Sequence, residues 1–173
     1  MTKHAVAIAI TGILSAAALC AGPRTVKVSL TDATGKPVGT AIITEKKAGA
    51  GVTIRLNLMG LTPGEHAIHI HQTAKCEMPG FTTAGGHFNP AGKKHGSLNP
   101  DGHHNGDMPN FTVKADGTSK ATIRDADVTL GDGPNSLYAN GGTALMVHAK
   151  ADDYKTDPSG AAGDRVACGT ITK

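Results

Sequence analysis

The histidines are the residues of this chain whose type and spacing could do chemistry. Seven of the nine histidines lie between His66 and Asp107, and another, His148, follows nearer the C-terminus. Imidazole is the commonest metal ligand that proteins offer, and a carboxylate among several imidazoles suits zinc or copper rather than calcium. The number and ordered spacing of these side chains predict more than one metal ion per chain.

His69 and His71 are the first candidate ligands. Residues two apart on a β-strand share a face, so these two imidazoles would project together while Ile68 and Ile70 point into the core. His66 would lie on the opposite face, where a structural hydrogen-bonding role is favoured over metal ligation. We therefore expect this strand to provide one side of a metal site.

His148 has two interpretations. It ends an apolar run over residues 143–147, and a single histidine in such a place is more often a satisfied core residue than a ligand. The pair His69 and His71, however, has too few ligands nearby in the sequence to complete a site. That shortage favours His148 as a further ligand.

A second ligand set lies in a stretch rich in Gly, Pro, Asn and His. It consists of His87, His95, one of the adjacent pair His103 and His104, and Asp107. Three nitrogens and one oxygen form the closed tetrahedral set that zinc accepts in structural sites. Neighbouring glycines permit the tight turns that aim ligands inward. The alternative, a solvated histidine-rich loop, would leave the aspartate and the turn residues without a reason.

Strands must position these side chains. Apolar and polar residues alternate strictly over residues 25–30 and 52–58, and shorter runs begin at Phe111 and Ala121. Such alternation predicts half-buried antiparallel strands, and glycine- or proline-containing turns separate the runs. No later stretch has a helical period. Many short strands with 23 glycines predict an all-β sandwich or flattened barrel.

Two long connections interrupt this pattern, at residues 72–110 and 150–164. A loop as long as the first is normally functional or disordered. Because it carries most of the histidines, we expect metal ions and a disulfide to order it.

The N-terminus has the pattern of a secretory signal. Lys3 gives a short positive head, residues 5–19 form an apolar run too short for a transmembrane helix, and small residues follow. We expect residues 1–21 to be a signal peptide and residues 22–173 to be one periplasmic or secreted domain. Cys20 leaves a lipid-anchored N-terminus open as an alternative, although Leu19 is bulkier than such sites usually accept.

The charge balance excludes one class of partner. The chain has 17 basic and 14 acidic residues, and residues 1–21 contribute only Lys3 to that balance. A small positive excess with two Tyr, three Phe and no Trp offers neither the charge footprint nor the stacking platform of a nucleic-acid-binding protein.

Export also changes the interpretation of the cysteines. In an oxidising compartment a pair of cysteines usually forms a disulfide. Cys20 falls in or beside the signal, which leaves Cys76 and Cys168 as the candidate bridge. Two buried free thiols are the alternative.

Several motifs together resemble one known family, the copper/zinc superoxide dismutases. They are residues 64–71 (GEHAIHIH), 85–90 (GGHFNP), 94–96 (KHG), 104–107 (HNGD), 147–148 with 152–153, and 163–169 (GDRVACG). Each motif alone is weak, but the set is specific, and the resemblance runs from about Val26 to Ile171. It implies an all-β fold, an eight-stranded antiparallel Greek-key barrel or sandwich with two long functional loops, an architecture of which this family is itself an example.

The resemblance also implies a ligand set, with one copper and one zinc ion per chain. Copper would be held by His69, His71, His87 and His148, and zinc by His87, His95, His104 and Asp107. His87 would bridge both ions and act in catalysis, while His103 would lie at the surface. The remaining implied roles are a carboxylate that steadies the metal-bound histidines (Asp152), a catalytic arginine beside copper (Arg165), and the family disulfide (Cys76–Cys168).

The implied activity is dismutation of superoxide to oxygen and hydrogen peroxide, through a copper redox cycle supported by zinc at the shared histidine. A non-enzymatic protein that binds or delivers copper is the alternative. A zinc-only structural domain would leave His69, His71 and His148 unexplained. The exported start, the long segment 77–84 and the short loop after His148 are more similar to bacterial or secreted members than to animal cytosolic ones. The sequence leaves the oligomeric state open, a homodimer included.

Overall fold

The computed structural model describes residues 22–173, so the predicted signal peptide and Cys20 lie outside the described residues. Within this range the chain forms nine strands and two short 3-10 helices, and no α-helix. The strands are β1 (Arg24–Asp32), β2 (Pro37–Glu45), β3 (Val52–Leu58), β4 (Gly64–His66), β5 (Ile68–His71), β6 (Phe111–Val113), β7 (Ser119–Asp125), β8 (Thr143–His148) and β9 (Arg165–Ile171). The 3-10 helices are η1 (Thr82–Ala84) and η2 (Ala139–Gly141).

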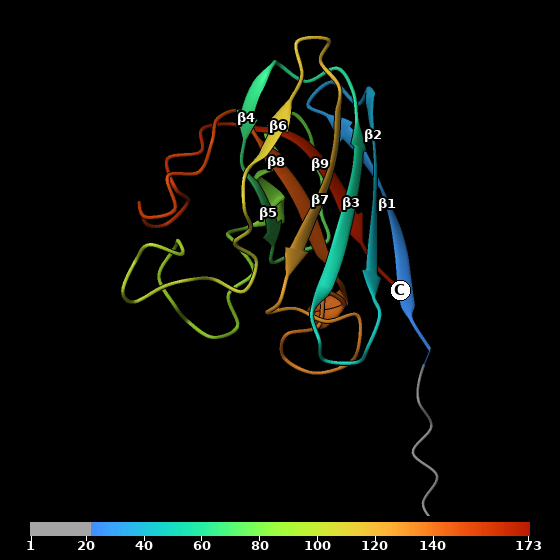
Figure 1. Ribbon diagram of the computed structural model, residues 1–173, viewed down its shortest axis with the longest axis vertical. Coiled ribbons are helices and arrows are strands. Elements are labelled where there is room, and N and C mark those ends of the chain that lie inside the picture. Colours follow the sequence, from blue (N-terminus) through green and yellow to red (C-terminus); the bar gives the residue numbers. More distant parts are fainter. Residues whose placement is uncertain (1–21) are drawn as a thin grey trace, which may run out of the picture.

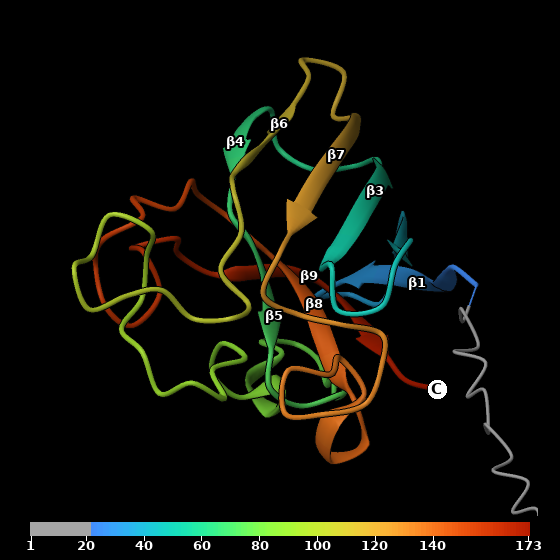
Figure 2. The ribbon, with the colours of Figure 1, turned by 60° about the horizontal axis from the view of Figure 1, so that its bottom comes forward.

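The strands curl into a flattened antiparallel barrel (Figures 1 and 2). Seven of them form one sheet in the order β5-β8-β9-β1-β2-β3-β7, and β4 pairs with β6. Only Ala67 separates β4 from β5, and β6 turns directly into β7 through the hydrogen bond from Lys114 N–H to Thr118 O. The short pair therefore links the two ends of the large sheet. With β4 and β5 taken as one interrupted strand, the predicted eight-stranded Greek-key barrel is confirmed.

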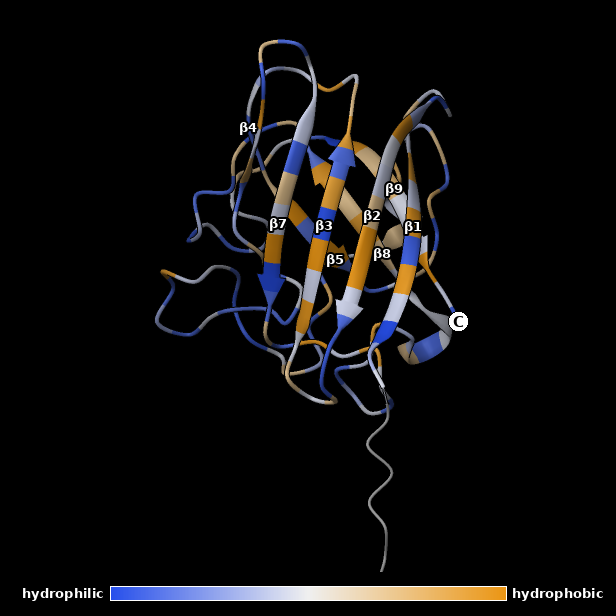
Figure 3. Cartoon of the chain, turned by 45° about the vertical axis from the view of Figure 1, so that its right-hand side comes forward, coloured by the Kyte–Doolittle hydropathy of each residue, from blue (hydrophilic) through white to orange (hydrophobic). Residues whose placement is uncertain are grey.

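The alternation in the sequence places the core. Along β3 every second residue is buried, and β2 and β7 show the same period (Figure 3). Leu30, Ile43 and Ile54 are fully buried between the facing strands. Each such side chain contributes roughly 1.5–3 kcal/mol by leaving water, so the apolar face of each strand must turn inward.

The two long connections leave the barrel on the same side. In Figures 1 and 2 residues 72–110 and residues 149–164 lie next to each other. Hydrogen bonds join them: Leu98 N–H donates to Tyr154 O at 2.9 Å, and the His95 backbone N–H donates to the Asp157 carboxylate at 2.8 Å. One loop therefore supports the other.

Two further expectations concern the whole chain. The disulfide between Cys76 and Cys168 is confirmed; it has a Cα–Cα distance of 5.6 Å and ties the first long loop to β9. Among residues 22–173, no helix has the length and apolar character that a membrane span requires.

Candidate metal centre

Two strands and one loop bring four histidines together. His69 and His71 project from β5, His148 ends the adjacent β8, and His87 lies in the loop that follows β5, bridged to His71 through the backbone. All four are buried, and one ring nitrogen of each lies within 4.8 Å of the others. The Nε2 atoms of His71 and His148 are 3.4 Å apart. Period-2 alternation places the β5 pair on one face, and the pairing of β5 with β8 adds His148.

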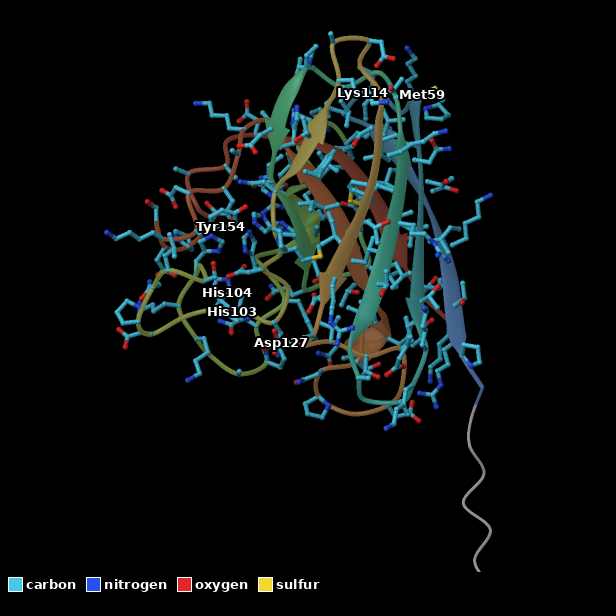
Figure 4. All side chains as sticks on the ribbon, in the orientation of Figure 1. Met59, His103, His104, Lys114, Asp127 and Tyr154 are labelled. Atoms are coloured by element: carbon cyan, nitrogen blue, oxygen red, sulfur yellow. A yellow bond between two sulfur atoms is a disulfide. The ribbon has the colours of Figure 1, made fainter. Side chains whose placement is uncertain are left out.

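A second cluster lies beside the first and is centred on the Asp107 carboxylate. Its Oδ1 is 2.8, 3.0 and 3.3 Å from the Nδ1 atoms of His87, His95 and His104. Of the two adjacent histidines His103 and His104, only His104 belongs to this cluster. His103 turns away and pairs with Asp127 at 3.0 Å, with 40% of its side chain exposed (Figure 4).

His87 belongs to both clusters. Its Nδ1 faces Asp107, whereas its Nε2 is buried and has no hydrogen-bond partner among residues 22–173. The same is true of His69 Nδ1. A buried polar atom without a partner costs about 1–3 kcal/mol, which a metal–nitrogen bond would remove. The donor set of imidazoles with one carboxylate therefore fits two ions of the zinc or copper type, with His87 between them.

Asp152 contacts both clusters from behind. Its Oδ2 accepts a hydrogen bond from His69 Nε2 at 2.7 Å, and its Oδ1 accepts one from His95 Nε2 at 3.0 Å. A proton fixed on Nε2 leaves Nδ1 as the free lone pair, so Asp152 selects the tautomer that can bind metal on each ring. Because of these contacts, Asp152, His69 and His95 also lie close enough together to form a third possible ligand set.

Backbone carbonyls orient the remaining two rings. His71 Nδ1 donates to Gly85 O at 2.9 Å, and His148 Nδ1 donates to Gly163 O at 3.2 Å. Both bonds leave Nε2 facing the other imidazoles. Each ring of the first cluster thus has one nitrogen held by the protein or by Asp107 and one directed at a common point.

Burial keeps three rings of the first cluster, those of His71, His87 and His148, neutral. It lowers the pKa of His71 well below its ordinary value, that of His87 to about 4, and that of His148 to about 3, with further lowering from neighbouring imidazoles. Neutral rings have the lone pairs that a metal needs, without loss of a proton.

The second cluster carries more charge. Burial alone would lower the pKa of His95, but its hydrogen bonds to Asp107 and Asp152 raise it to about 9. Burial would raise the pKa of Asp107, but hydrogen bonds from three imidazoles hold it far below its ordinary value. Two ionised carboxylates therefore face this cluster, which favours a divalent cation there.

Arg165 lies at the start of β9, at the edge of a cavity of about 490 Å³ that His71, His87 and His148 also line. Its guanidinium donates to Phe81 O and to Gly85 O, both at 2.7 Å. Cys168, three residues later, is bonded to Cys76, so the disulfide and these two carbonyls fix the arginine next to the first cluster.

His66 has the structural role expected of it. Its Nδ1 lies 2.7 Å from His148 O, and its Nε2 lies 2.8 Å from Thr62 O. The ring packs 5.9 Å from that of Phe111 in the barrel interior. It thereby holds the backbone of His148 in place without entering the metal clusters.

Sequence reasoning did not find two residues that support the site. Gly160 has a φ of 68°, and a Cβ there would overlap Asp152 Oδ1 and lie 2.7 Å from His95 Nε2. Asn110 holds the backbone of Asp152 by donating to its carbonyl at 3.0 Å and accepting from its N–H at 2.8 Å. A single glycine or asparagine in loops rich in both carries no local signal of such a role.

Comparison with known proteins gives a consistent result. The family model for copper/zinc superoxide dismutase (SODC) matches residues 38–171. The protein "Superoxide dismutase [Cu-Zn] 2" of Aquifex aeolicus is 50% identical over 139 residues, which cover 79% of this chain and 80% of that protein. The crystal structure of a SOD-like protein from Bacillus subtilis has a TM-score of 0.80 and 38% identity, covering 84% of this chain and 97% of that one. Cu/Zn superoxide dismutase from Brucella abortus has a TM-score of 0.69 and 33% identity, covering 86% and 99%.

Proposed function

The chain belongs to the copper/zinc superoxide dismutase family and dismutates superoxide with copper and zinc, and we propose which of its own side chains perform this reaction. The copper ligands are His69, His71, His87 and His148. The zinc ligands are His87, His95, His104 and Asp107. Both sets match groups whose ligand atoms lie within 4.8 Å of one another.

One observation carries this assignment. The His87 ring lies between the two groups, with Nδ1 at 2.8 Å from Asp107 and Nε2 buried without a partner among the described residues. His87 is also the residue that these two ligand groups share. It would therefore hold both ions, one through each ring nitrogen.

Dismutation takes one electron from one superoxide, gives one electron to another and consumes two protons. Bound copper supplies this reversible one-electron change, and zinc has no such chemistry. His87 lines the cavity and its ring is fixed through Nδ1, so its Nε2 would be the atom that holds a proton for the substrate whenever it is not bound to copper.

Arg165 positions the substrate. A guanidinium has five N–H donors, and the contacts with Phe81 O and Gly85 O leave others directed elsewhere. Its fixed positive charge at the cavity edge attracts a small anion toward the His71 side of the site.

The same domain acts outside the cytoplasm. We propose that residues 1–21 are removed on export to the periplasm or the medium, and that residues 22–173 are the mature domain. The Cys76–Cys168 disulfide supports an oxidising compartment. Mass spectrometry of the exported protein distinguishes a free N-terminus from lipidation at Cys20, and sedimentation distinguishes a monomer from a homodimer.

The alternative is a protein that binds or delivers copper without catalysis. It is not favoured, because both ligand groups and the arginine are complete in this chain. A superoxide-consumption assay on protein loaded with both metals separates the two functions.

The test of the bridge is His87→Ala, with His103→Ala as the matched control. His103 is a histidine of the same loop but pairs with Asp127 at the surface. We expect His87→Ala to lose nearly all turnover and to bind copper and zinc independently of each other, while His103→Ala keeps both metals and activity. Activity of the His87→Ala protein equal to that of the wild type would contradict the bridge.

A further inference from the structure

The outer face of the β1-β2-β3-β7 sheet carries twelve outward-facing side chains in three rows that cross all four strands. In register, the rows are Thr25–Thr44–Thr53–Arg124, Lys27–Ile42–Arg55–Thr122 and Ser29–Thr40–Asn57–Lys120. Figure 3 views this face, with hydrophilic segments among hydrophobic ones along β1, β3 and β7. We call these twelve residues the basic face.

The basic face carries cations but no carboxylate. Its four charged residues, Lys27, Arg55, Lys120 and Arg124, are exposed, and none forms an ion pair within residues 22–173. The acidic residues that end β2 and β7, Glu45 and Asp125, point inward and are 1% and 3% exposed. The positive charge of this face is therefore not neutralised by its own strands.

The adjacent turn extends the charge. Lys46 and Lys47 connect β2 to β3 and are exposed, and Arg124 reaches this turn by donating to Ala50 O at 2.8 Å. The turn, residues 46–51, contains no acidic residue. Six cations thus lie on one side of the barrel.

The other side chains of the basic face are mostly hydroxyls. Six of the twelve residues are Thr or Ser, and Thr25 and Thr44 hydrogen-bond each other across the strands at 3.3 Å. Neighbouring strands lie about 4.8 Å apart, so Lys27 and Arg55, two strands apart, are separated by roughly 10 Å at the backbone. Each of the three rows therefore contains at least one cation together with at least one hydroxyl.

We propose that the basic face binds a linear anionic polysaccharide, one that bears carboxylate or sulfate groups along a chain of hydroxyls. The cations pair with the anionic groups, and the Thr and Ser hydroxyls bond the sugar hydroxyls between them. Ile42 is the one large apolar side chain of the face, so the face does not provide the apolar anchor by which helices enter lipid surfaces. It also has no aromatic ring on which a nucleic-acid base could stack.

The position of the face leaves catalysis undisturbed. In Figure 1 β1 and β2 lie on the right of the barrel, and the two long connections, the first of which carries four of the metal ligands, lie on the left. A polysaccharide on the basic face would hold the enzyme in place while the cavity beside Arg165 stays open to superoxide.

The test measures binding of the metal-loaded protein to dextran sulfate, polygalacturonate and neutral dextran, each immobilised, over a range of salt concentrations. We expect binding to one or both anionic polymers, none to neutral dextran, and loss at high salt because exposed charges are screened. K27E/R55E should weaken binding by at least about tenfold, since two attractions become repulsions. The matched control is K75E/K155E, which makes the same charge change at two exposed lysines of the long loops, outside the basic face.

Failure of this proposal can be distinguished from failure of the proposed dismutase function. K27E/R55E should keep the metal content and turnover of the wild type, so its loss of binding cannot arise from a damaged metal centre. Equal binding by K27E/R55E and wild type, equal weakening by K75E/K155E, or no binding to either anionic polymer would overturn the proposal. Tighter binding to anionic lipid vesicles or duplex DNA than to the polymers would also overturn it.

Discussion

Asp152→Asn is the most informative single change for the metal centre. The carboxylate accepts from His69 Nε2 at 2.7 Å and from His95 Nε2 at 3.0 Å, and it is almost fully buried. Asparagine has nearly the same size but only one accepting oxygen. Its NH2 group would face the N–H of one imidazole, and that ring would have to move its proton to Nδ1, the nitrogen that the metal needs.

The magnitude follows from these two contacts. Removing a group that orients metal-bound histidines typically costs about 10–100-fold in metal affinity, which is about 1.4–2.7 kcal/mol at 1.36 kcal/mol per factor of ten. Because one oxygen faces the copper set and the other the zinc set, the loss should concern both metals. The variant should fold, because its barrel core is unchanged.

Competition with a chelator of known affinity measures both dissociation constants at pH 7. Asp153→Asn is the matched control, since Asp153 is the next residue and is exposed. It removes the same charge from the same loop and should leave both affinities close to those of the wild type. Unchanged affinity for both metals in Asp152→Asn would refute the tautomer argument, and equal losses in both variants would show that only loop charge matters.

Three other predictions concern different parts of the molecule. Arg165→Ile should lower turnover by about 10- to 1,000-fold with unchanged metal content. Charge in an active-site cleft raises the rate of substrate capture by about this factor, and this enzyme family is itself the reference case for that range. A wild-type rate would exclude the role of Arg165. Reducing Cys76–Cys168 should weaken metal retention and lower Tm by roughly 10 °C, since the bridge closes a 92-residue separation; an unchanged Tm would contradict this. Burial raises the pKa of Asp125 to about 7, above its unfolded value, so its proton stabilises the fold at low pH and that contribution is lost as pH rises from about 4 to about 7. Asp125→Asn should flatten this part of the Tm profile, and parallel profiles would rule it out.

Local patterns were sufficient to predict the strands and the type of metal chemistry. Alternation over residues 52–58 became β3 with the expected buried side, because a two-residue period fixes the face of each side chain whatever its neighbours are. In the same way, His69 and His71 share a face of β5, whereas His66 lies elsewhere and bonds backbone carbonyls. The number of imidazoles with one aspartate was enough to predict zinc or copper.

The order of the strands could not be obtained from such patterns. β9 lies between β8 and β1, and β4 pairs with β6, although nothing in the alternation of these segments distinguishes these partners from others. Strand pairing depends on contacts between residues far apart in the chain. Among local signals, the short turns after β1 and after β2 do join strands that pair with each other.

The sequence by itself determined which residue types could bind metal and on which face of a strand they stand, because both properties are local. Only the tertiary structure decided that His148 meets His71, that His87 lies between two clusters, and that Asp152 reaches both. It also revealed that Gly160 leaves the space which Asp152 occupies. These contacts join segments from different ends of the chain, and their distances are set by barrel closure, by the pairing of β5 with β8, and by the disulfide that holds the loop.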